Sequence, residues 1–100
     1  MDPVDDPFYL IAVIRPRMDV AADVEAQLRT LMAGTNAEEG CEYMELVVSD
    51  DDPTTGLMLE KFRSRGDWEE HMLTEHVARV NANLAGLLRE PTELRFYSTK

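Results

Sequence analysis

Residues 57–77 read LMLEKFRSRGDWEEHMLTEHV, and the rest of the chain is organised around this stretch. Alternating side chains in residues 57–63 predict a strand that places Met58, Glu60 and Phe62 on one face. The following residues have a helical pattern and include the only tryptophan and both histidines of the chain. The stretch therefore predicts a strand, a short turn and a short helix that breaks into a second helix.

Cap residues and stop signals set the limits of these two helices. Ser64 or Asp67 is a suitable N-cap for the first helix, and Thr74 is one for the second. Apolar residues then recur at helical spacing, at Val77, Val80, Leu84, Leu87 and Leu88. Gly86 weakens this second helix near its end, and Pro91 stops it.

Three more strands and one long helix are predicted outside this stretch. Apolar residues predict strands at 8–15, 41–49 and 92–98. Asp19 is a good N-cap for a helix of about 15 residues, for which Gly34 is a plausible C-cap. The order strand, helix, strand, strand, helix, strand indicates an α+β, ferredoxin-like fold with an antiparallel sheet.

The two faces of the predicted sheet differ in what covers them. Right-handed crossovers place both helical segments on the same face. The other face still carries apolar side chains, among them Ile11, Val13, Tyr43 and Val47. A patch of this size is unusual on a soluble monomer, so the pattern predicts a homodimer packed sheet to sheet.

Length and composition narrow the classes of function. One hundred residues form one domain, predicted at 8–98 after a tail of residues 1–7. The net charge of −10 disfavours nucleic acid and anionic membranes as partners. The acidic, proline-broken start is unlike a signal peptide, so we expect a cytoplasmic protein. The single cysteine, Cys41, allows no disulfide within the chain and is expected to be a small buried residue.

The histidines are the main candidates for chemistry. His71 follows Trp68 by one turn and precedes Met72, so it is expected to face the sheet. Its ordinary pKa suits a general base in a pocket, where water or substrate is its partner; the alternative is a core histidine bonded to the backbone. His76 is expected at the start of a helix, as a cap or surface residue.

The other candidate residues each allow two interpretations. Glu60 is either paired at a sheet edge or a pocket carboxyl group with a raised pKa. Trp68, Met58 and Met72 are either core residues or walls for a flat aromatic ligand. His71 and His76 do not share a helix face and no three-ligand cluster is evident, so we expect no metal. Nucleotide-binding motifs are missing as well, so no cofactor is expected.

Two segments together resemble the antibiotic biosynthesis monooxygenase domain family. They are EEGCEYMEL at 38–46 and the stretch 57–77. The family's pattern is EPGCxxYxL, then a strand with ExW, then a helix with Hx₂(S/T)xH. By this resemblance His71, His76 and Glu60 match family positions, and the expected fold is a dimeric α/β barrel. Members include cofactor-free quinol or anthrone monooxygenases, haem-degrading enzymes and an isomerase of a sugar-phosphate signal.

The chain also departs from the family's pattern. Phe62 replaces the strand tryptophan, and Ala12 lies in a first strand that has no asparagine. Asn81 or Asn83 lies where the haem-degrading branch has an axial histidine, so haem degradation is disfavoured.

The resemblance and the residues together predict a cofactor-independent monooxygenase. It is expected to use dioxygen on a quinol, phenolic or polyketide-like aromatic substrate. His71 is the expected base and Glu60 its orienter. The substrate-binding side chains are expected to be Trp68, Phe62, Met72, Met58 and His76. The alternatives are an isomerase that uses the same pocket and a non-catalytic dimeric module that binds small molecules.

Overall fold

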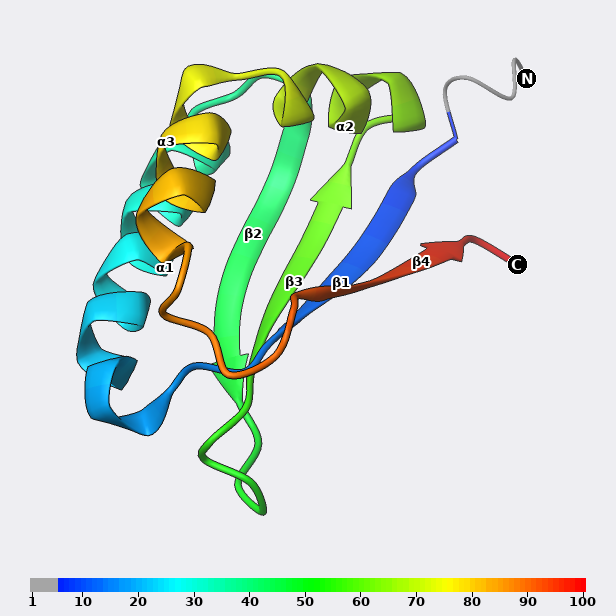
Figure 1. Ribbon diagram of the computed structural model, residues 1–100. Coiled ribbons are helices and arrows are strands. Elements are labelled where there is room, and N and C mark those ends of the chain that lie inside the picture. Colours follow the sequence, from blue (N-terminus) through cyan, green and yellow to red (C-terminus); the bar gives the residue numbers. More distant parts are fainter. Residues whose placement is uncertain (1–5) are drawn as a thin grey trace.

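The computed structural model describes residues 6–100 and has the predicted ferredoxin-like α+β fold (Figure 1). Its elements are β1 (Phe8–Ile14), the 3-10 turn η2 (Met18–Val20), α1 (Ala21–Asn36), β2 (Cys41–Val48), β3 (Gly56–Phe62), α2 (Arg65–Met72), α3 (Glu75–Leu84) and β4 (Glu93–Ser98). The strands form one antiparallel sheet in the order β2-β3-β1-β4. Most of the predicted tail, residues 1–5, lies outside the described residues.

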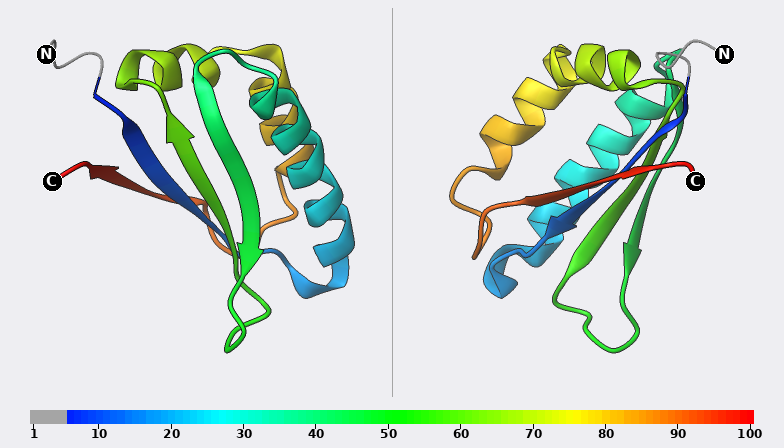
Figure 2. Two further views of the ribbon diagram at one scale, coloured as in Figure 1. Left: turned by 180° about the vertical axis from the view of Figure 1, so that it is seen from behind. Right: turned by 90° about the vertical axis from the view of Figure 1, so that its right-hand side faces the viewer.

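The helices cover one face of the sheet, as Figure 2 shows from two sides. The core forms between this face and α1 and α3, from alternate residues of the strands. Leu10 lies opposite Glu60 in β3, and Glu60 lies opposite Met44 in β2. This register places Glu60 in a row of apolar side chains beneath the helices, where only 6% of the residue is exposed.

Strand β4 differs from the other strands because all of its residues are exposed. It pairs with β1 through Leu10↔Phe96 and Ala12↔Leu94. In Figures 1 and 2 it extends away from the helices, so the helix-side face is open at this edge. Leu94 and Phe96 are therefore 41% and 50% exposed although they face the covered side of the sheet.

The ends of α1 differ from the prediction. Asp19 does not cap the helix: it lies in η2, where its carboxylate accepts a hydrogen bond from Arg17. Gly34 does not end the helix, which continues to Asn36. The Asn36 amide pairs with both the N–H and the C=O of Met44, and these bonds favour continuation of the helix up to β2.

The two short helices follow the predicted caps more closely. The Ser64 hydroxyl accepts from the N–H of Asp67, and the Thr74 hydroxyl accepts from the N–H of Val77. The second helix ends earlier than its apolar spacing predicts, at Leu84. Gly86 has a φ of 81°, which is the left-handed conformation that ends helices.

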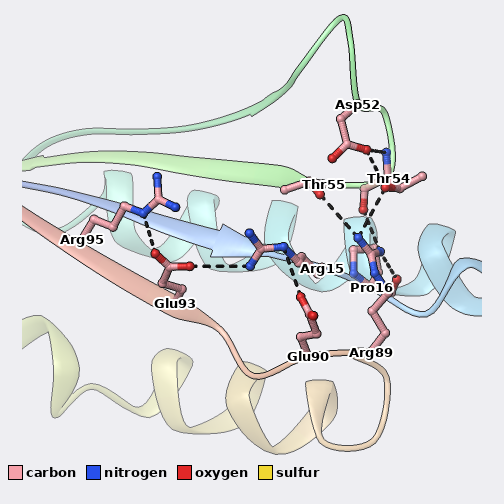
Figure 3. A network of polar contacts seen from close by, with 9 residues as sticks. All are labelled: Arg15, Pro16, Asp52, Thr54, Thr55, Arg89, Glu90, Glu93 and Arg95. Atoms are coloured by element: carbon pink, nitrogen blue, oxygen red, sulfur yellow. Dashed lines mark hydrogen bonds and ion pairs between the residues drawn. The ribbon is translucent and has the colours of Figure 1, made fainter.

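A polar network ties the connection before β4 to the rest of the sheet (Figure 3). Arg89 donates hydrogen bonds to the carbonyl oxygens of Pro16 and Thr54. Arg15 forms ion pairs with Glu90 and Glu93. These contacts position the chain between α3 and the open edge of the sheet. No helix within residues 6–100 has the length and apolar content that crossing a membrane requires.

Candidate functional site

A cavity of about 200 Å³ lies between the sheet and the helices. Its walls are mainly apolar and include Leu10, Ala12, Leu28, Leu31, Met44, Met58, Val77 and Leu84. The polar side chains that line it are those of Glu60, His71, Asn81 and Thr92. An apolar cavity with a few convergent polar groups is typical of a small-molecule site.

Glu60 contributes a buried carboxyl group to this cavity. Burial, followed by the negative charge of Glu38, raises its pKa from 4.5 to about 8. Glu60 is therefore a pocket carboxyl group with a raised pKa and not a paired residue at a sheet edge. Within residues 6–100 no ion pair involves it. At neutral pH it is mainly protonated, so it can donate a hydrogen bond to a ligand in the cavity.

His71 is buried, with only 3% of the residue exposed, and it also lines the cavity. Its Nδ1 lies 2.9 Å from Oε2 of Glu38, and its ring packs at 5.0 Å from that of Phe62. The expectation that water or substrate supplies its partner is therefore wrong for Nδ1. Glu60 is not its orienter either, since the carboxylate bonded to it belongs to Glu38.

His76 meets the same carboxylate from the other side. Its Nε2 lies 2.5 Å from Oε2 of Glu38, and its side chain is 26% exposed. It lies in the first turn of α3 but does not cap it, since Thr74 does. The break between α2 and α3 turns both imidazoles towards one another, with ring centroids 6.0 Å apart.

Glu38, His71 and His76 also form the one candidate metal-binding group found within residues 6–100. Their ligand atoms lie within 4.8 Å of one another, so the sequence-based statement that no three-ligand cluster exists is wrong. However, bonds of 2.0–2.1 Å to a tetrahedral zinc ion separate ligand atoms by roughly 3.3 Å. The contacts of 2.9 and 2.5 Å from Glu38 are shorter than this separation; the first has the ordinary length of a hydrogen bond and the second is a short one.

The remaining predicted site residues divide into two groups. Trp68, Met58 and Met72 line the cavity, although Met72 is 40% exposed and lies at its rim. Trp68 packs at 5.2 Å from the exposed Phe96 ring. Phe62 is fully buried behind His71, and neither it nor His76 lines the cavity.

Sequence reasoning missed Glu38 and the role of Asn81 as a cavity residue. Glu38 lies 33 residues before His71, in the turn after α1, and no local pattern connects them. Its place in the EEGC segment was the only available signal. Cys41 is buried as expected, and burial, together with nearby glutamates, raises the pKa of its thiol to about 11, so it stays protonated.

Comparisons with known proteins agree with this architecture. The sequence model of the antibiotic biosynthesis monooxygenase family matches residues 7–83. Rv0793 of Mycobacterium tuberculosis, provisionally named a monooxygenase, is 32% identical over 85 residues, which are 85% of this chain and 83% of that protein. The solved structure of Rv0793 has a TM-score of 0.89 at 29% identity, covering 94% of this chain and 95% of that one.

Two further solved structures are equally similar in fold. PA3566 from Pseudomonas aeruginosa has a TM-score of 0.88 at 29% identity and covers 97% of both chains. A conserved protein from Methanosarcina mazei has a TM-score of 0.91 at 20% identity, covering 98% of this chain and 97% of that one. The sheet, its one-sided helices and the cavity between them define a ferredoxin-like α+β protein. The chain belongs to the antibiotic biosynthesis monooxygenase family.

Proposed function

We propose that the protein is a cofactor-independent monooxygenase that acts on a small quinol or phenol with dioxygen. The observation that carries this proposal is the apolar cavity with His71 and Glu60 in its wall. The cavity of about 200 Å³ is smaller than the roughly 300–1,000 Å³ of drug-sized sites, which favours a substrate of one ring over a polycyclic one.

The two polar groups have complementary roles in this chemistry. His71 removes a proton from the substrate hydroxyl, and the protonated Glu60 donates a hydrogen bond to a substrate oxygen. The substrate anion then supplies the electrons that reduce dioxygen. A quinol becomes a hydroxyquinone as one oxygen atom enters the ring, and the other leaves as water. The apolar walls hold the ring and exclude solvent.

We also propose that two copies of the chain form a homodimer. The sheet face opposite the helices carries the aromatic and aliphatic side chains of Tyr9, Ile11, Tyr43, Leu59 and Tyr97. Tyr43 and Tyr97 are 43% and 46% exposed. A homodimer packed through this face covers them and also shields the sheet beneath the cavity from water.

The test measures oxygen uptake with a panel of single-ring quinols and phenols. We expect uptake of one dioxygen per quinol and, with ¹⁸O₂, one labelled atom in the product. His71→Asn keeps an amide near Glu38 but removes the base, so turnover should fall by about 100-fold or more. Substrate rearrangement without oxygen uptake would identify an isomerase, and thermal stabilisation without any conversion would identify a binding module.

A further inference from the structure

We propose that Glu38 is the positioning residue of His71 and that His76 holds Glu38 in place, so that Nε2 of His71 faces the cavity as a proton acceptor. The purpose of this arrangement rests on the proposed function, in which His71 is the base. The arrangement itself is a property of the folded chain and is measurable without a substrate.

The hydrogen bonds determine which nitrogen of His71 carries the proton. A carboxylate only accepts hydrogen bonds, so Nδ1 of His71, 2.9 Å from Glu38, must be the protonated nitrogen. A neutral imidazole has a single N–H, which leaves a free electron pair on Nε2. No residue in the described part of the chain forms a hydrogen bond with that nitrogen, and His71 lines the cavity.

His76 restricts the Glu38 carboxylate from the opposite side. Its Nε2 donates to the same Oε2 atom, so this oxygen is held between two imidazoles. The backbone of Glu38 is also restrained, because the Glu38 N–H donates a hydrogen bond to the carbonyl oxygen of Thr35 at the end of α1. Glu38 therefore has little freedom to turn away from His71.

Gly34 allows this contact by its lack of a side chain. A Cβ atom at this position in α1 would lie 3.0 Å from Cγ of the His76 ring. This contact is tighter than most Cβ contacts, so any larger residue here requires the His76 ring to shift by a few tenths of an ångström. This close approach explains why a residue that weakens helices lies inside α1.

The charge of Glu38 acts on both polar groups of the cavity. Its carboxylate stabilises the imidazolium that forms when His71 takes up a proton. The same charge, added to the larger effect of burial, raises the pKa of Glu60 to about 8. Glu38 thus contacts the base directly, while the buried Glu60 stays mainly protonated in the cavity wall at neutral pH.

Nitrogen-15 NMR tests the assignment, because the chain has two histidines and hence four ring nitrogens. His76→Asn assigns the signals. With neutral histidines, wild-type His71 should show a protonated Nδ1 and an unprotonated Nε2. Glu38→Gln should populate both tautomers of His71, whereas the control Glu39→Gln, at a 90% exposed side chain, should change nothing. A protonated Nε2 in the wild type would overturn the proposal even if Glu38→Gln does not fold.

Two further measurements separate this proposal from its alternatives. Cobalt(II) added to the wild type should give no tetrahedral absorption bands; stoichiometric bands that Glu38→Gln abolishes would show a metal site instead. If a quinol is turned over, Glu38→Gln should lower kcat by about 10-fold or more with KM nearly unchanged, as expected when an amide replaces the carboxylate that orients a histidine base. Absence of turnover with every quinol would refute the proposed function but leave the tautomer result standing.

Discussion

Glu60 and Glu38 are neighbouring carboxyl groups with different surroundings. Glu60 lies in the apolar row under the helices, whereas Glu38 accepts hydrogen bonds from two imidazoles. Desolvation disfavours charge on Glu60 and raises its pKa to about 8. The two carboxyl groups therefore suit different roles: Glu60 faces the cavity as a hydrogen-bond donor, and Glu38 accepts from His71 and His76.

Glu60 should make stability depend on pH. The pKa of Glu60 is raised to about 8 in the folded protein, so between about pH 4.5 and 8 the folded state holds a proton that the unfolded chain releases. Stability from this group is present below that window and is lost as pH rises through it. One pKa unit corresponds to about 1.4 kcal/mol, so a rise from 4.5 to about 8 corresponds to a loss on the order of 5 kcal/mol.

Glu60→Gln should remove this loss. The variant is expected to be more stable than the wild type at about pH 9, by on the order of 5 kcal/mol, and similar to it near pH 5. Urea unfolding at several pH values measures the difference. Glu70→Gln, at an exposed position in α2, is the control and should keep the wild-type profile. Equal pH dependence in Glu60→Gln and the wild type would contradict the argument.

At the scale of elements, the turn between α1 and β2 packs tightly against α2. A Cβ atom at Gly40 would lie 2.6 Å from both Cβ and Cγ of Asp67. The Gly40 carbonyl also accepts a hydrogen bond from the N–H of Arg63 at 2.8 Å, just before α2. This contact holds together the two segments that carry Glu38 and His71.

Gly40→Ala should therefore destabilise the protein by about 1–3 kcal/mol, since overpacking forces backbone shifts. Gly66→Ala is the matched control. A Cβ atom there meets only the Ser64 hydroxyl at 3.7 Å, and alanine favours the helix, so a gain of about 0.5–1 kcal/mol is expected. Chemical denaturation of both variants measures the contrast. Equal effects of the two substitutions would show that the contact with Asp67 is unimportant.

At the scale of the whole molecule, the sheet carries a second, uncovered face. Leu59 lies at its centre, opposite Ile11 in β1 and Glu45 in β2. We expect light scattering at micromolar concentration to give about twice 11.4 kDa. Leu59→Asp should weaken the dimer by burying a second carboxylate beside Glu45 in the interface. Ala22→Asp on the exposed side of α1 is the control, and a monomeric wild type would refute the dimer.

Local sequence patterns were sufficient to predict most of the secondary structure and the order of the elements. Alternation placed Met58, Glu60 and Phe62 on one face of β3, and that face is buried. The capping preferences of Ser64 and Thr74 gave the starts of α2 and α3. The order of the elements then led to the ferredoxin-like sheet. These features depend on residues within a few positions of one another, so they can be read from sequence periods and caps.

The candidate site depends on tertiary structure. Glu38 reaches His71 and His76 across 33 and 38 residues, and no spacing rule covers such distances. The break after α2 changes which way the helix faces, so both imidazoles converge although their spacing on one helix would separate them. The helical spacing also predicted that Met72 and His71 share an environment. In the structure His71 is buried, whereas Met72 lies at the rim of the cavity and is 40% exposed. Only long-range packing decides which polar groups share a cavity, because it sets burial and hydrogen-bond partners together.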